Sequence, residues 1–242
     1  MPDWILKLTK DFNTAFIVDN RWKYLLEGVQ NTLILTFFAL ILGVVLGIVI
    51  AAIRVTYDKQ YTQMKGGIGK FLLCIGNAIS KVYLTVIRGT PSMVQILIIF
   101  FIIMASSNNK MLCGIIAFGI NSGAYVAEII RGGIMSIDEG QSEAGRSLGF
   151  NYIQTMWYIV LPQTFKNILP ALANEFIVLL KETAIAGYVG VTDLTRGANI
   201  IRGITYQSFW PLLSIAAIYL IMVMFFTWLV GILERRLREN ER

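Results

Sequence analysis

GVQNTLILTFFALILGVVLGIVIAAI, residues 28–53, is the stretch of sequence that decides the fold class. Its 26 residues include no charged side chain. As a helix rising about 1.5 Å per residue, the stretch is longer than a hydrocarbon core of about 30 Å. The whole 242-residue chain shares this bias, with 56% hydrophobic and 15% charged residues. A soluble domain of this length could not bury so much apolar surface, so we predict an all-α membrane protein.

The composition also excludes most enzyme chemistry. The chain has no His and two Cys, isolated at Cys74 and Cys113, so zinc clusters, a disulfide framework, a Ser/His/Asp triad and a Cys/His dyad all lack their parts. The net charge of +6 is spread between apolar runs instead of forming one basic face, which indicates membrane topology and not nucleic-acid binding. We expect no catalytic residue, no metal and no cofactor in this chain.

Five membrane spans are predicted from the apolar runs, near residues 24–54, 86–107, 111–131, 165–191 and 210–234. The fourth contains Glu175, Lys181 and Glu182. On a helix these charges and Asn174 fall within one stripe about 120° wide, which leaves the other faces apolar. Residues 71–87 are ambiguous, because a sixth span there would need a very tight turn at residues 88–90. We favour an interfacial or lead-in helix that feeds the next span.

Positively charged residues give the orientation. Lys and Arg are more numerous on the side that carries the polar segment after Arg131 and the C-terminal tail, and such an excess marks the cytoplasmic side. We expect residues 1–23 outside and residues 239–242 inside. A six-span arrangement shows the same excess, so charge does not choose the number of spans. Residues 1–23 carry both signs of charge and lack the apolar core of a cleaved signal peptide.

The strongest local signal lies in the polar segment 136–162. Glu143-Ala144-Gly145 is followed after three residues by Gly149, and after nine more by Ile159-Val160-Leu161-Pro162. The small residues allow close helix approach, the glutamate can accept charge-assisted hydrogen bonds, Gly149 permits a sharp turn, and Pro162 can begin a helix. The competing interpretation is a solvated helical connection between two spans.

This spacing resembles the EAA loop of bacterial ABC import permeases of type I. In that family the loop forms a short cytoplasmic coupling helix that docks on an ATPase and passes its motion to the membrane helices. Gly145 departs from the family's second alanine, which keeps the surface small but lowers helix propensity. The resemblance assigns ATPase coupling to Glu143, Ala144, Gly145, Gly149, Leu161 and Pro162.

Three further segments narrow the resemblance to permeases for polar amino acids. They are residues 88–95 (RGTPSMVQ), residues 121–128 with 131–134, and residues 174–183. The resemblance implies a permease domain at residues 24–238 with five spans, in the bacterial cytoplasmic membrane. It also implies an external N-terminus, a cytoplasmic C-terminus and a coupling loop at residues 136–162.

Charged residues in the spans suggest a pathway. Each ionised side chain near the bilayer centre costs roughly 2.5 to 3.5 kcal/mol, so it needs partners or water. A polar amino acid brings an ammonium and a carboxylate that such charges could match. The candidate pathway residues are Gln95, Asn121, Tyr125, Asn174, Glu175, Lys181 and Glu182.

Structural roles for the same residues stay open. The charges of the fourth span could pair with one another or with an adjacent subunit. Asn121 and Tyr125 share a helical face with Glu128, which can reach Arg131 at i+3. This face suits a pore wall and equally an interhelical hydrogen-bond seam. Two Gly-x-x-x-Gly patterns, at residues 43–47 and 119–123, are assigned to helix packing.

The expected partners follow from what the chain lacks. It has no G-x-x-x-x-G-K-[S/T] phosphate loop, so ATP and Mg²⁺ are expected on separate subunits. We expect two cytoplasmic ABC ATPase subunits, a second permease subunit that is identical or similar, an extracytoplasmic amino acid-binding protein and membrane lipid, and no nucleic acid. The expected function is uptake of a polar amino acid by alternating access driven by ATP.

Two other classes of function were weighed. An ion-gradient-driven amino acid carrier would need inverted repeats around a midplane site, and no convincing internal duplication is present. An intramembrane hydrolase would need a nucleophile and a base, but Glu175 and Glu182 have no His nearby because the chain contains none.

Overall fold

The computed structural model describes residues 3–239, and this part of the chain is helical without strands, as the sequence predicts. The α-helices are α1 (Asp3–Phe12), α2 (Trp22–Gln60), α3 (Ile68–Gly89), α4 (Ser92–Ile98), α5 (Lys110–Met135), α6 (Glu139–Ser147), α7 (Tyr152–Thr155), α8 (Leu161–Glu182), α9 (Leu194–Thr205) and α10 (Phe209–Glu239). Short π or 3-10 segments are η1 (Asn13–Ile17), η2 (Val18–Asn20), η3 (Ile99–Ile103), η4 (Met156–Val160) and η5 (Thr183–Val189).

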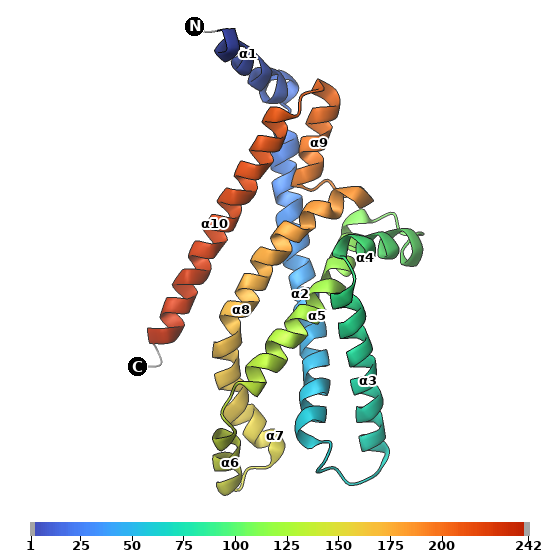
Figure 1. The fold of residues 1–242 in the computed structure, drawn as a ribbon, viewed down its shortest axis with the longest axis vertical. Coiled ribbons are helices and arrows are strands. Elements are labelled where there is room, and N and C mark those ends of the chain that lie inside the picture. The colour runs from blue at the N-terminus through green and yellow to red at the C-terminus, as the bar shows by residue number, and fades with distance from the viewer. Residues whose placement is uncertain (1–2, 240–242) are drawn as a thin grey trace.

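The long helices run roughly along the long axis of the molecule (Figure 1). Helices α1 and α9 lie at one end, while α6, α7 and the connection between α2 and α3 lie at the other. Four helices are long and apolar enough to cross a bilayer, namely α2, α3, α5 and residues 209–237 of α10. Helix α8 is not among these four. It carries four charged residues, at positions 166, 175, 181 and 182.

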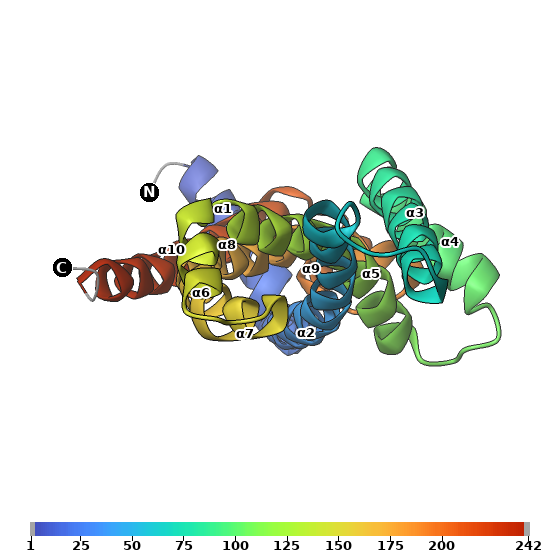
Figure 2. The same cartoon turned by 90° about the horizontal axis from the view of Figure 1, so that it is seen from below.

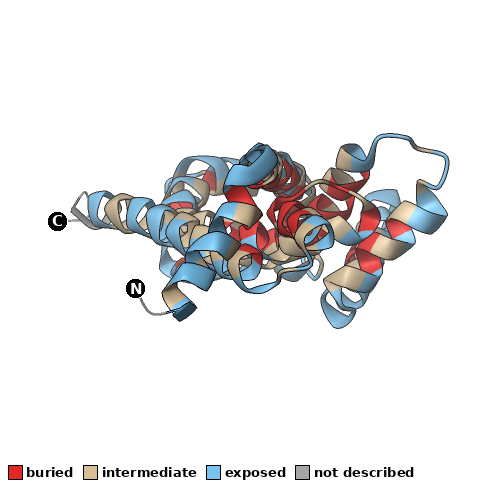
Figure 3. Ribbon diagram, turned by 90° about the horizontal axis from the view of Figure 1, so that it is seen from above, coloured by how far each residue is buried: buried red, intermediate tan, exposed pale blue. Residues whose placement is uncertain are grey.

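Helix α5 is the centre of the molecule and α10 its periphery. In their most apolar windows, 67% of the residues of α5 are buried, against 6% in α10. The buried residues accordingly gather in the middle of the molecule, and α10 is mainly exposed along its length (Figure 3). An apolar surface of this kind on α10 fits contact with lipid or with another membrane helix.

Glycines allow α2 and α5 to pack closely, and these two helices share the most extensive contact in the fold. A Cβ atom on Gly47 would lie 2.5 Å from Val126 Cγ1, and one on Gly119 would lie 2.6 Å from Leu42 Cδ2. Neither position has room for a side chain. The two Gly-x-x-x-Gly patterns therefore serve helix packing, as predicted from the sequence.

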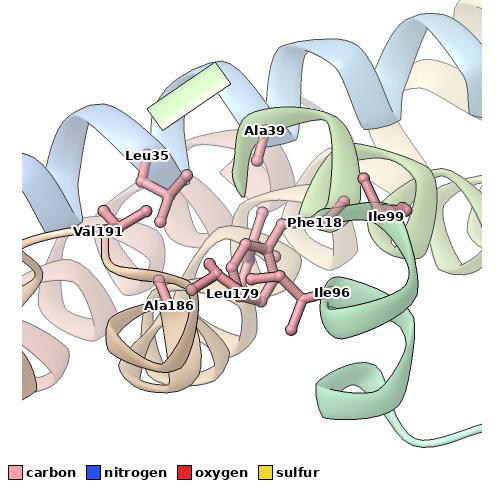
Figure 4. Close-up of a cluster of buried hydrophobic side chains, with 10 residues drawn as sticks. Leu35, Ala39, Ile96, Ile99, Phe118, Leu179, Ala186 and Val191 are labelled. Atoms are coloured by element: carbon pink, nitrogen blue, oxygen red, sulfur yellow. The ribbon is translucent and has the colours of Figure 1, made fainter. Parts of the chain in front are cut away.

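A cluster of buried hydrophobic side chains joins α2 and α5 to α4 and α8 (Figure 4). Phe118 of α5 is 1% exposed and lies at its centre. The other labelled members come from three stretches of the chain, residues 35–39, 96–99 and 179–191, so this cluster sets how the helices sit relative to one another. They are Leu35, Ala39, Ile96, Ile99, Leu179, Ala186 and Val191.

The second predicted span, near 86–107, differs in the structure. Helix α3 already begins at Ile68 and ends at Gly89, and a separate shorter helix begins at Ser92. Thr90 between them is extended (φ −120°, ψ 147°). Pro91 explains the break, because proline disfavours the helical conformation of the residue before it and has no N–H to donate. Residues 71–87 therefore belong to a helix of span length, and residues 86–107 do not form one helix.

Candidate functional site

Helix α6, which carries the Glu-Ala-Gly sequence, ends in a glycine-dependent turn. Gly149 has φ +82°. Its N–H donates to the carbonyl of Arg146 at 2.9 Å, and the N–H of Phe150 donates to the carbonyl of Gly145 at 3.0 Å. These two bonds define a Schellman motif, whose left-handed position favours glycine. The sharp turn predicted at Gly149 is present, and it reverses the chain toward α7.

The return segment packs directly on α6 at Gly145. This glycine is buried, and a Cβ atom there would lie 2.9 Å from Thr155 Oγ1 and 3.0 Å from Ile159 Cδ1. Asn151 and Gln154 form a capping box at the start of α7. The small residue at position 145 therefore lets α6 lie close to the segment that leads into α8.

Leu161 and Pro162 lie at the junction between this segment and α8. Helix α8 begins at Leu161, with Pro162 in its first turn, where the missing N–H costs little. Short connections join α6 to α7, and η4 joins α7 to α8, so no extended loop separates α6 from α8 (Figure 1).

The outer side of α6 is open to solvent. Glu143 and Ala144 are exposed, and the Glu143 carboxylate lies 3.9 Å from Arg146. Such an exposed ion pair contributes little to stability. Leu148, at the end of α6, is 74% exposed. Charged and apolar side chains are thus both exposed on and beside α6. Figure 2 shows α6 and α7 from the end of the molecule at which they lie.

A cleft of about 480 Å³ lies between α6, α7 and the C-terminal end of α2. Its lining includes Asp58, Glu139, Arg146 and Tyr152. Burial raises the pKa of the Tyr152 phenol above its ordinary value, so this hydroxyl remains a hydrogen-bond donor at neutral pH. The cleft leaves α6 attached to the helix bundle mainly through α7 and η4.

The polar residues of α8 do not lie together on one surface as the sequence stripe predicts. Asn174 and Lys181 are exposed, and Glu182 is half-buried. Glu175 points into the bundle, is 8% exposed and accepts a hydrogen bond of 2.8 Å from Ser122 Oγ of α5. Ser122, absent from the candidate list, therefore supplies the partner of the most deeply buried of these residues.

Gln95 and Asn121 are joined by a hydrogen bond in the interior. Asn121 Nδ2 donates to Gln95 Oε1 at 2.9 Å. Gln95 Nε2 lies within hydrogen-bond distance of the carbonyls of Ile87 (2.7 Å) and Thr90 (3.0 Å). These are carbonyls that the end of α3 leaves without a helical partner. Gln95 thus stabilises the break after α3 and ties it to α5.

Tyr125 lies beside a group of charged side chains on α2, α3 and α5. Glu128 accepts from Arg131 at 3.1 and 3.3 Å, the i+3 contact that the sequence predicts. Arg131 also lies 3.8 Å from Asp58. Arg88 lies 3.8 Å from Glu128, with its guanidinium 5.5 Å from the centre of the Tyr125 ring. Arg88 and Asp58 were not among the predicted site residues.

Comparisons with known proteins match most of this chain. A family model described as "Binding-protein-dependent transport system inner membrane component" matches residues 75–239, which include the whole of the loop described above. A putative glutamine transport system permease protein of Rickettsia typhi is 37% identical over 220 residues, covering 90% of this chain and 94% of that protein. An arginine transport system permease protein of Bacillus subtilis is 34% identical over 221 residues, with the same coverage of both chains.

Solved structures show the same fold. A chain from an amino acid ABC transporter crystallised with histidines superposes with a TM-score of 0.79 at 42% identity, covering 91% of this chain and 98% of the other. A chain from a methionine ABC transporter in an inward-facing conformation superposes with a TM-score of 0.72 at 19% identity, covering 88% of this chain and 95% of the other.

Proposed function

The chain belongs to the family of binding-protein-dependent transport system inner membrane components, and we propose how its helices and its loop perform transport. It is the membrane permease subunit of an amino acid ABC importer, and ATP is hydrolysed by a separate subunit. The transported solute is a polar amino acid; glutamine and arginine, named for the relatives, are the first to test.

We propose that α6 is the coupling helix that docks on the ATPase. The observation that carries this proposal is the exposed α6, which is fixed in its C-terminal half by the contact at Gly145 and by the Schellman turn at Gly149. Glu143 and Ala144 face solvent and are available to a partner. Movement of α6 is passed through α7 and Pro162 into α8. ATP drives the cycle only through its different affinities for the inward-open and outward-open states.

The proposed membrane topology has five crossings. The second crossing consists of α3 continued by α4 and η3, and the fourth consists of α8 continued by η5. The N-terminal helix α1 is placed outside and α6 inside. This orientation is supported by the lysines at the α6 end of the molecule, which carries Lys59, Lys65 and Lys70 on and beside the connection between α2 and α3.

The pathway is proposed to run along the exposed polar side of α8. Asn174 and Lys181 are exposed on a helix that crosses the membrane in this topology, and neither side chain is accommodated by lipid. A water-filled pathway, closed on its other side by a second permease subunit, accommodates them, with Glu182 and Tyr125 beside it. Gln95, Asn121 and Glu175 are assigned to holding its wall together, because their partners lie inside the bundle.

The partners follow from this arrangement. The complex contains a second permease, identical or similar, two ATPase subunits on the cytoplasmic side, and a binding protein that delivers the amino acid at the outer face of the bacterial cytoplasmic membrane. Uptake of radiolabelled glutamine and arginine into proteoliposomes tests the proposal. We expect uptake only when ATP is enclosed and both ATPase and binding protein are present. Uptake by the permease alone, driven by an ion gradient, would identify an autonomous carrier instead.

A further inference from the structure

The break between α3 and α4 lies near the middle of the membrane. The uncharged run of α2, residues 28–53, has its centre near residue 40. Gly119 of α5 packs on Leu42, at nearly this level. Two residues further along α5, Asn121 donates to Gln95, which lies one turn after the break. The non-helical backbone at Thr90 is therefore close to the bilayer centre.

This break is not covered by the protein itself. Arg88, Gly89, Thr90 and Pro91 are all exposed. Non-helical backbone does not face hydrocarbon, because lipid cannot satisfy its polar groups; it occurs where it is buried in protein or lines water. The exposed side of the break must therefore face a water-filled pathway or a neighbouring subunit.

The contacts of Arg88 favour the water-filled pathway. Its side chain is 45% exposed, and its ion contact with Glu128 is 3.8 Å long. Glu128 already accepts two shorter bonds from Arg131. The guanidinium also lies over the Tyr125 ring, 5.5 Å from its centre, a position that favours a cation. Arg88 thus keeps donors available toward the exposed side, next to a carboxylate.

An α-amino acid presents the two charges that complement this pair. Its carboxylate matches the planar fork of an arginine, which can donate two parallel bonds. Its ammonium matches a carboxylate at short distance. Binding would replace one long ion contact by two charge-assisted contacts, without leaving either Arg88 or Glu128 as an unpaired charge.

We propose that Arg88 binds the carboxylate of the transported amino acid and that Glu128 binds its ammonium, with Tyr125 supporting the guanidinium from behind. This inference rests on the proposed transport function and names the recognition site within that pathway. The site recognises the α-carboxylate and the α-ammonium of the amino acid and not its side chain. It therefore accepts amino acids with different side chains and rejects derivatives that lack the carboxylate.

The test uses the purified permease–ATPase complex in lipid nanodiscs, without binding protein. Calorimetric titration measures the affinity for L-glutamine and L-arginine and for their α-amides, which keep the ammonium and lose the carboxylate. Wild type should bind the acids more tightly than the amides. Arg88→Gln should weaken binding of the acids by about tenfold or more, while affinity for the amides changes little.

Three further variants separate recognition from folding. Arg88→Lys keeps the cation without the fork, so its loss should be smaller. Glu128→Gln should weaken acids and amides alike, because both carry the ammonium. Lys81→Gln removes an exposed charge from the same helix and should bind as wild type does. The melting temperature and subunit stoichiometry of each variant are measured in parallel.

Several results would overturn the inference. For wild type, these results are equal binding of acids and amides, or no measurable binding. For Arg88→Gln, they are an equal loss of affinity for acids and amides, or dissociation of the permease pair with binding unchanged. These failures differ from failure of the proposed function. Wild-type proteoliposomes that take up the amino acid with ATP would keep the importer and reject this site, whereas absence of ATP-driven uptake would reject both.

Discussion

Replacing Gly149 by alanine should weaken docking of the ATPase while leaving the membrane helices folded. The residue has φ +82°, and a left-handed conformation costs an L-residue about 1–2 kcal/mol. Restriction of the unfolded chain by alanine returns roughly 0.4–1 kcal/mol. The net strain of about 1 kcal/mol is local to the turn that ends α6. If the ATPase binds only the native turn, its affinity falls by up to about fivefold, because the strain lowers the fraction of permease that carries this turn.

The matched control is Gly190→Ala. Gly190 has φ +79°, so it carries the same kind of strain, but it follows η5 in the connection between α8 and α9 and lies outside α6 and α7. A Cβ atom there would meet the flexible side chain of Lys110 at 3.0 Å. Both variants should lose similar thermal stability, and only Gly149→Ala should lose ATPase affinity.

The assay is titration of purified ATPase against each permease variant in nanodiscs, with substrate-stimulated ATP hydrolysis measured on the same samples. Equal ATPase affinity and equal stimulation for Gly149→Ala and wild type would refute a coupling role for this turn. So would an equal loss in Gly190→Ala, since that would trace the effect to general destabilisation.

Three further predictions concern packing, charge and pH. Gly47→Ala should lower the stability of the detergent-solubilised permease by about 1–2 kcal/mol. A Cβ atom there meets Val126 and the backbone of Ala127 within 3.0 Å, so overpacking costs about 2–3 kcal/mol, and alanine regains about 1 kcal/mol of helix propensity. Gly231→Ala, where nothing lies within 4 Å, should not be destabilised, and equal melting temperatures would contradict the close packing. A double-mutant cycle of Ser122→Ala and Glu175→Leu, each of which removes one partner of the hydrogen bond, should give a coupling energy of about 0.6–1.7 kcal/mol in thermal unfolding. Additive effects of the two substitutions would contradict a stabilising bond between these side chains. Burial raises the pKa of Asp193 to about 6 from its ordinary 3.8, so the folded state binds the proton more tightly and stability from this group falls as pH rises from about 4 to 6. Asp193→Asn should flatten that part of the melting profile, and an unchanged slope would contradict the assignment.

The helical class and the turn at Gly149 could be read from the sequence because each depends on a local property. A run of uncharged residues long enough to cross the bilayer indicates a membrane helix, whichever other helices pack against it. The φ requirement at Gly149 and the first-turn position of Pro162 are likewise properties of single residues in a short segment. The Gly-x-x-x-Gly patterns were read correctly for the same reason, since a missing side chain permits approach by any partner.

The span near 86–107 and the stripe on α8 were placed less well because both depend on partners elsewhere in the chain. Hydropathy joins residues on either side of Pro91, although the proline ends the helix between them. Angular position on α8 groups Glu175 with Lys181, but Ser122 on α5 draws one inward while the other stays exposed. Arg88 was missed because its significance comes from Tyr125 and Glu128 on another helix.

We propose that this chain moves solute only when a separate ATPase drives α6. The most direct measurement is the rate of ATP hydrolysis by the reconstituted complex with and without amino acid-loaded binding protein, compared with the permease alone. We expect no hydrolysis by the permease alone, and stimulation by loaded binding protein in the complex that is reduced in Gly149→Ala. Hydrolysis by the permease alone, or ATPase activity that ignores the loaded binding protein, would contradict this proposal.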